Sequence, residues 1–158
     1  MNYYEEVVDG ETLLRYPPSP RHELICERLH AWVDASLAGI TTTRLLEIRA
    51  PIELRPGTIV RPDITLITAA TGKAWLIAEV VDSDDHRADT VVKKNLYEEI
   101  RLPRLWMVDP RYDNVEVYHG SPYGMALRHI LAGRERLTES LIPQLDVIIR
   151  DLFADPVE

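Results

Sequence analysis

Residues 74–81, Ala-Trp-Leu-Ile-Ala-Glu-Val-Val, place one carboxylate in the middle of an otherwise apolar run. The run is short and largely apolar, which predicts a strand buried on both faces. A charge in a buried strand costs several kcal/mol unless an opposite charge or a bound cation accompanies it. Glu79 therefore needs a partner, and the rest of the fold has to supply one.

The sequence around this strand alternates between strand and helix patterns. Residues 9–10, Asp-Gly, favour a tight hairpin. Apolar residues spaced by three and four predict an amphipathic helix over 21–37, with Ser19 as N-cap, and a second helix over 86–100. Asp146 is expected to cap a short closing helix. The other expected strands cover residues 43–54, 59–67, 104–108, 114–119 and 126–131.

This order of elements predicts a single α/β (α+β) domain over residues 1–158, with a mixed central sheet flanked by helices. No stretch approaches the roughly 18 consecutive apolar residues of a membrane span. The first residues resemble no secretory or transit signal, so a cytoplasmic protein is expected. Cys26 is the only cysteine, which excludes an intramolecular disulfide and argues against a cysteine-based zinc site.

The charge balance limits the binding partners of this chain. Its 18 Lys and Arg against 26 Asp and Glu give a formal net charge of −8. That value argues against a general nucleic-acid binder, because non-specific affinity comes from phosphates neutralised by Lys and Arg. Arginines outnumber acids over residues 44–61 and 128–136, so local basic surfaces are still open, although such runs are most often solvated faces.

A second carboxylate is expected beside Glu79. Asp63 follows Pro62 in the preceding strand segment, and strands joined by a short turn usually pair as neighbours. Two carboxylates about 4 Å apart repel by roughly 4 kcal/mol at an effective dielectric near 20. Such a pair must share a proton or hold a metal ion. Oxygen ligands suit Mg²⁺ or Mn²⁺.

The helix after this strand offers a cation. Asp89, Lys93 and Tyr97 are spaced by four and therefore lie along one helix face. Lys93 could reach over the two acids, orient or deprotonate an attacking water and stabilise charge on a phosphate. Asp89 could hold the Lys93 side chain, and Tyr97 is expected to pack.

Four segments together resemble the Uma-two family, restriction-endonuclease-like proteins of the PD-(D/E)XK nuclease superfamily. They are Pro-Asp at 62–63, Glu-Val-Val at 79–81, the spaced Asp, Lys and Tyr of 89–97, and Pro-Arg-Leu-Trp-Met-Val-Asp-Pro at 103–110. The likeness extends over nearly the whole chain. It departs from the family pattern at residues 82–85, where Asp-Ser-Asp-Asp replaces Ser-Pro-Ser-Thr, and at Arg101-Leu102, where the family has Gly-Val.

The resemblance implies a restriction-endonuclease-like fold and a Mg²⁺- or Mn²⁺-dependent endonuclease that hydrolyses DNA as a homodimer. The family's metal ligands correspond to Asp63, Glu79 and the backbone carbonyl of Val80. Val81 stands where the superfamily usually has its lysine, so the resemblance assigns that role to Lys93. His22 lies where the family tends to have histidine, and its role is left open.

Other readings of the same residues stay open. Glu79 could pair with Arg61, and Asp63 could face water. The acids Asp82, Asp84 and Asp85 are expected to form a solvated turn at a helix start, where negative charge is favourable. The alternative function is a catalytically inactive nuclease fold that serves in binding or dimerisation. A third reading is an enzyme on another phosphodiester, such as RNA or a nucleotide.

Overall fold

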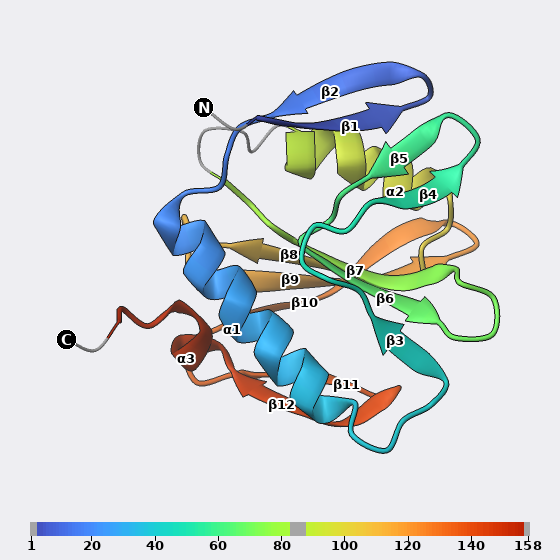
Figure 1. The fold of residues 1–158 in the computed structure, drawn as a ribbon. Helices are drawn as coiled ribbons and strands as arrows, with labels where there is room; N and C mark the ends of the chain where they lie inside the picture. The colour runs from blue at the N-terminus through green and yellow to red at the C-terminus, as the bar shows by residue number, and fades with distance from the viewer. Residues whose placement is uncertain (1–2, 83–87, 157–158) are drawn as a thin grey trace.

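The computed structural model describes residues 3–82 and 88–156 and is rich in strands (Figure 1). Over those residues the helices are α1 (Pro20–Ser36), α2 (Lys94–Glu99) and α3 (Ile149–Phe153), and a π-helical turn, η1 (Ala88–Lys93), leads into α2. The strands are β1 (Tyr4–Val8), β2 (Glu11–Arg15), β3 (Thr43–Leu45), β4 (Ile52–Arg55), β5 (Thr58–Val60), β6 (Ile64–Thr68), β7 (Ala74–Val80), β8 (Arg104–Asp109), β9 (Asn114–Ser121), β10 (Gly124–Ala132), β11 (Arg136–Glu139) and β12 (Ile142–Ile148). No helix in this part of the chain is long and apolar enough to cross a membrane.

The central sheet is mixed, as predicted. Its strand order is β10-β9-β8-β7-β6-β3, and only the β7–β8 pair among these described strands is parallel. A parallel pair needs a crossover connection, and here η1 and α2 supply it. The expected α+β architecture, with helices flanking a mixed sheet, is confirmed.

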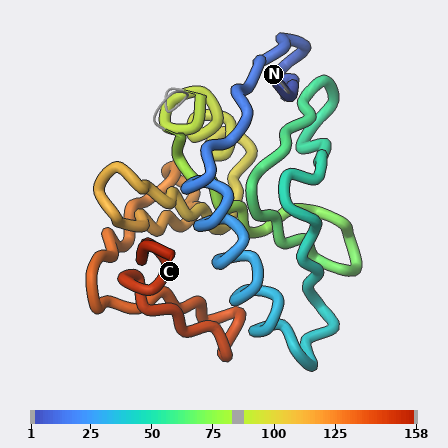
Figure 2. The backbone as a smooth tube through the Cα atoms, turned by 60° about the vertical axis from the view of Figure 1, so that its left-hand side comes forward, coloured from blue at the N-terminus to red at the C-terminus, as the bar shows by residue number. Residues whose placement is uncertain are grey.

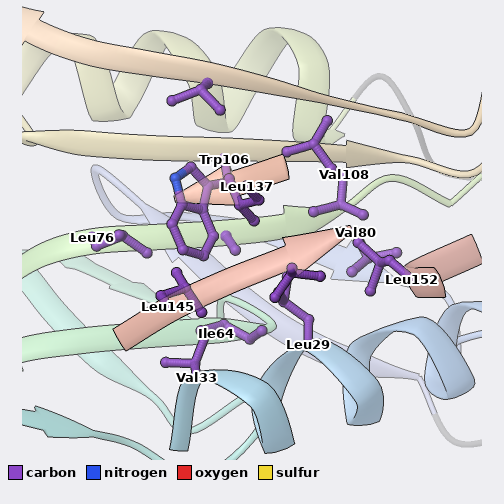
Figure 3. Close-up of a cluster of buried hydrophobic side chains, with 14 of the residues drawn as sticks. Leu29, Val33, Ile64, Leu76, Val80, Trp106, Val108, Leu137, Leu145 and Leu152 are labelled. Carbon is purple, nitrogen blue, oxygen red and sulfur yellow. The ribbon is translucent and has the colours of Figure 1, made fainter. Parts of the chain in front are cut away.

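Side chains of the central sheet pack into two separate hydrophobic clusters, one on each face. On one face Leu76 and Val80 of β7 pack with Leu29 of α1, Trp106 of β8 and Leu152 of α3 (Figure 3). The alternate residues of the same strands point to the other face, where they meet the second sheet and α2. Both faces are therefore covered, which is why β7 reads as a continuous apolar run.

The second sheet has the order β2-β1-β5-β4 and lies beside η1 and α2 (Figures 1 and 2). Its β1–β2 hairpin turns at Asp9 and Gly10, which have φ values of 51° and 82°. A two-residue hairpin turn with both residues at positive φ is the one that an Asp-Gly pair favours. The predicted hairpin is confirmed.

The expected single strand over residues 59–67 is wrong. β5 belongs to the second sheet and β6 to the central sheet, and the chain passes from one to the other between Val60 and Ile64. Pro62 lies in this crossing, and a proline has no N–H to continue a strand ladder. The crossing places Asp63 where the two sheets meet.

Helix positions agree with the sequence except at the end of the chain. The Ser19 side chain accepts a hydrogen bond from the His22 N–H and caps α1, as predicted. The described part of the second helix starts at Ala88, and residues 86–87 of the prediction lie outside the described residues. The predicted cap at Asp146 is wrong, because this residue is in β12 and pairs with Arg136. Its apolar neighbours alternate with it, which is a strand pattern.

The turn from α2 to β8 contains Arg101, where the sequence has no glycine although the pattern it resembles has one. Arg101 has a φ of 57°, the left-handed conformation that usually requires glycine. Its N–H is donated to the Glu98 carbonyl and the Leu102 N–H to the Tyr97 carbonyl, which is the hydrogen-bond pattern of a Schellman motif. The chain keeps the glycine-type turn here although it has an arginine.

Arg101→Gly is therefore expected to increase the free energy of unfolding by about 1 kcal/mol, because the left-handed conformation costs a non-glycine residue roughly 1–2 kcal/mol. Urea denaturation followed by circular dichroism measures the change. The control Glu98→Gly, inside α2, should instead destabilise by roughly 0.5 kcal/mol through lower helix propensity. A destabilised Arg101→Gly variant would contradict the strain argument.

Candidate active site

Glu79 finds its counter-charge in Lys93. The side chain of Glu79 projects from β7 toward the second sheet and α2 and is 2% exposed. Lys93, at the end of η1, is 0% exposed and donates from Nζ to Glu79 Oε2 at 2.6 Å. The Tyr97 hydroxyl donates to Glu79 Oε1 at 3.3 Å. The spacing of four thus brings both side chains to Glu79, and Tyr97 does more than pack.

Asp63 lies beside Glu79, just before the first residue of β6. Ile64 of β6 pairs with Ala78 of β7, so one further step along the ladder sets Asp63 opposite Glu79. Asp63 Oδ2 accepts the Val80 N–H at 2.8 Å and so takes the place of a ladder carbonyl. The carboxylate is 4% exposed, and the reading that it faces water is wrong.

Two cationic or proton-bearing side chains hold the other oxygen of Asp63. His22 Nε2 lies 3.0 Å from Oδ1, and Arg49 donates to the same oxygen at 3.0 Å. His22 Nδ1 lies 3.6 Å from Asp82 Oδ2. The N-terminal end of α1 therefore contributes His22 to the site, where its ring lies between the carboxylates of Asp63 and Asp82.

A buried ion network that sequence reasoning missed adjoins Lys93. Glu6 of β1 lies 2.8 Å from Lys93 Nζ and also accepts from the Arg61 N–H at 2.6 Å. Arg15 of β2 bridges Glu6 and Asp89, at 2.8 Å from Asp89 Oδ1. Glu6 shares one face of the hairpin with the half-buried Val8, and this alternation was the only sequence signal for it.

Burial and charge set the proton affinities in this cluster. Desolvation raises the pKa of the Glu79 carboxyl well above its ordinary value, although the Lys93 charge opposes the rise. Burial disfavours the charged amine of Lys93, but Glu79 and Glu6 together raise its pKa well above the usual range. Burial also acts against the Glu6 carboxylate, yet Lys93 and Arg15 hold its pKa below the ordinary value.

Asp63 shows the opposite balance from Glu79. Burial alone would raise its pKa, but the hydrogen bond and charge of His22, the Val80 N–H and Arg49 lower the pKa to about 2. The same contact acts on His22, whose pKa is raised by Asp63 although burial opposes the charged ring. Asp63 is thus held ionised by its contacts, whereas burial opposes the charge of Glu79 and Lys93 compensates it.

The carboxylate oxygens of Asp63 and Glu79 are the type of ligand atom that a hard divalent cation prefers. Asp63 and Glu79 lie opposite each other at the ends of neighbouring segments, and carboxylates are the ligands that Mg²⁺ and Mn²⁺ prefer. Each of the buried acids Glu6, Asp63, Glu79 and Asp89 already contacts a cationic side chain of the protein: Lys93 and Arg15 serve Glu6, Glu79 and Asp89, and Arg49 serves Asp63. No group of three or more His, Cys, Asp or Glu side chains within residues 3–82 and 88–156 could by itself hold a metal ion.

Three expectations about neighbouring residues are wrong. Arg61 does not pair with Glu79, because its N–H is donated to Glu6 and its guanidinium to the Arg49 carbonyl. Asp89 pairs with Arg15 instead of holding Lys93 directly. Asp82 is not solvated, since its side chain is 11% exposed beside His22. The acids Asp84 and Asp85 lie outside the described residues.

Comparisons with known proteins bear on the family and on the fold. A family model named Uma2, described as "Putative restriction endonuclease", matches residues 3–150. The fold is similar to the crystal structure of "a putative nuclease belonging to DUF820" from Anabaena variabilis, with a TM-score of 0.77. That likeness covers 94% of this chain and 89% of the other at 14% identity, so it establishes the fold alone. Curated proteins provide no match.

The low pKa of Asp63 predicts how stability depends on pH. A carboxyl with a depressed pKa stabilises the folded state above its unfolded pKa, and the contribution is lost as the pH falls toward the folded value. The pKa of Asp63 falls from 3.8 to about 2 on folding, which corresponds to about 2 kcal/mol in the free energy of unfolding. The stability difference between wild type and Asp63→Asn should therefore shrink between pH 4 and pH 2.

Urea denaturation at several pH values measures this difference. Asp113→Asn is the control, because it removes an exposed carboxylate and should retain the wild-type loss of stability in acid. A difference between wild type and Asp63→Asn that stays constant from pH 5 to pH 2 would show that Asp63 is not held ionised by its contacts.

Proposed function

Because the chain belongs to the Uma2 family, we propose that it is a divalent-metal-dependent endonuclease that hydrolyses phosphodiester bonds of DNA. The observation that supports this most is the buried contact between Glu79 and Lys93, with Asp63 opposite Glu79 in register. This arrangement supports the proposal because it brings a carboxylate of β7, a carboxylate just before β6 and an amine into one buried cluster. Action in the cytoplasm and assembly as a homodimer belong to the same proposal.

Asp63, Glu79 and the backbone carbonyl of Val80 are the groups that would hold Mg²⁺ or Mn²⁺. When bound, such an ion polarises a phosphate and makes water more acidic, which is the chemistry that phosphodiester hydrolysis needs. β7 carries Glu79 and Val80 in a rigid central strand, and the Val80 N–H fixes the Asp63 carboxylate. The two acids are thus oriented before any ligand arrives.

Lys93 supplies the positive charge from the protein itself. Its amine is held protonated by the surrounding carboxylates, so at neutral pH it acts as a cation and a hydrogen-bond donor. Such a group orients an attacking water and stabilises the charge that develops on a phosphate. His22 holds the Asp63 carboxylate from the side of α1 and keeps it ionised.

One observation favours the alternative function, an inactive nuclease fold that serves in binding or dimerisation. Protein cations already contact both acids, Lys93 at Glu79 and Arg49 at Asp63. A folded state that neutralises its own acids in this way does not depend on a metal ion for stability. Metal binding and cleavage therefore discriminate the two functions.

The proposal predicts that purified protein nicks plasmid DNA in Mg²⁺ or Mn²⁺. Asp63→Asn, Glu79→Gln and Lys93→Met should each reduce the cleavage rate about 100-fold or more, since each removes a group that acts on the reacting phosphate or water. Gel analysis of supercoiled, nicked and linear plasmid measures the rates. RNA and a small phosphodiester tested in parallel identify a different substrate class.

Matched variants separate chemistry from folding. Lys94→Met changes the adjacent lysine and Asp113→Asn an exposed acid, and both should cleave at the wild-type rate. Lys93→Met leaves two buried acids without their cation and is expected to lose stability, so thermal unfolding of each variant is recorded. Wild-type cleavage by well-folded Asp63→Asn would disprove the proposed role of this acid.

Metal binding is expected to strengthen with pH. The raised pKa of Glu79 means that a proton competes with the metal ion for this carboxyl group. Without metal, the contribution of Glu79 to the free energy of unfolding is fully present below its ordinary pKa of 4.5 and is lost as the pH rises through the raised pKa. The increase in Tm that Mn²⁺ causes should therefore be larger at pH 8 than at pH 6. Thermal unfolding measures it, and Glu79→Gln should abolish the increase. A Tm independent of Mn²⁺ at both pH values would favour the inactive module.

A further inference from the structure

Lys93 is shared between two carboxylates that come from different parts of the fold. Its Nζ lies 2.6 Å from Glu79 Oε2 in the central sheet and 2.8 Å from Glu6 Oε2 in the N-terminal hairpin. All three side chains are almost completely buried. The amine is therefore held from two directions, and only one of them belongs to the proposed metal-ligand pair.

Glu79 cannot serve a metal ion and the ammonium of Lys93 equally well. Both cations seek the same carboxylate, and two positive groups that share it repel each other. Once an ion occupies Glu79, a lysine with no other partner would turn away or lose its place near the phosphate. Glu6 offers the second carboxylate that this situation requires.

Glu6 itself is rigidly held. Arg15 donates to Glu6 Oε1 and the Arg61 N–H to Glu6 Oε2. Arg15 is fixed in turn by Asp89 in η1, four residues before Lys93. The hairpin is tied to the rest of the second sheet through Val7 of β1, which pairs with Ile59 of β5. The hairpin lies next to η1 and α2 in both views (Figures 1 and 2).

We propose that Glu6 is a positioning residue that keeps the Lys93 ammonium in the site when Glu79 binds a metal ion. The inference rests on the proposed function, because it assigns a purpose to the second partner of Lys93 in that reaction. It makes the N-terminal hairpin part of the catalytic machinery, although the hairpin contributes no ligand and no reacting group.

The kinetic test compares Glu6→Gln with Glu5→Gln on plasmid DNA. Glu5 is the matched control, since it is the neighbouring residue on the same strand and is exposed on the opposite face. Glu6→Gln should lower kcat about tenfold or more, while KM for DNA and the Mn²⁺-induced increase in Tm stay at wild-type values. Glu6→Asp, which keeps the charge, should recover part of kcat. Glu5→Gln should match the wild type.

A second measurement reads the position of Lys93 without any cleavage. The chain has three lysines, Lys73, Lys93 and Lys94, so Nζ resonances of ¹⁵N-lysine-labelled protein can be assigned with Lys73→Arg and Lys94→Arg. The Lys93 ammonium resonance should persist in wild type with and without Mg²⁺. In Glu6→Gln it should persist without Mg²⁺ and weaken through exchange with water when Mg²⁺ is added.

The outcomes separate the two proposals. Wild-type kcat in folded Glu6→Gln, or a Lys93 resonance that survives Mg²⁺ in that variant, overturns the role of Glu6. A Glu6→Gln variant that loses the Mn²⁺ response also overturns it, because Glu6 would then act on metal binding or folding. Absence of cleavage by wild type disproves the proposed function, and the Lys93 resonance still decides whether Glu6 holds the amine.

Discussion

The contact between Glu79 and Lys93 is the interaction around which this structure is arranged. A carboxylate in the central strand of a sheet covered on both faces has no access to water, so the fold must bring a cation to it. The crossover between β7 and β8 provides that cation from its first turns. The segment of η1 and α2 therefore does two things: it connects the parallel strands β7 and β8, and it carries the lysine that compensates the buried charge of Glu79.

A buried ion pair of this kind rarely stands alone, and here a chain of opposite charges extends from it. Lys93 also contacts Glu6, which contacts Arg15, which contacts Asp89. Each member would be costly to bury without the next. The network joins the N-terminal hairpin, the central sheet and η1, so the second sheet is held to the site by charge as well as by its apolar cluster.

The sequence indicated the central part of the site and missed its surroundings for a physical reason. Glu79 was detectable because an acid within an apolar run needs a partner. Lys93 was detectable because its spacing of four from Asp89 and Tyr97 and the family resemblance both indicated it. Glu6 and Arg15 lie in a hairpin with a mixed polar and apolar sequence. They are far along the chain from Asp63 and Glu79, so no local spacing connects them with the site. Arg49 precedes Asp63 by 14 residues in an irregular segment, where no periodicity predicts a side chain's direction.

The sequence by itself determined most of the helices and strands, and it showed that Glu79 needs a counter-charge. Hydrophobic periodicity, helix caps and an acid within an apolar run are local properties of the chain. The tertiary structure decided which charges meet. It moved the chain from one sheet to the other at Pro62, which set Asp63 against the Val80 N–H, and it placed Glu6 beside Lys93. Such contacts depend on how separate elements pack, and no local pattern encodes that arrangement.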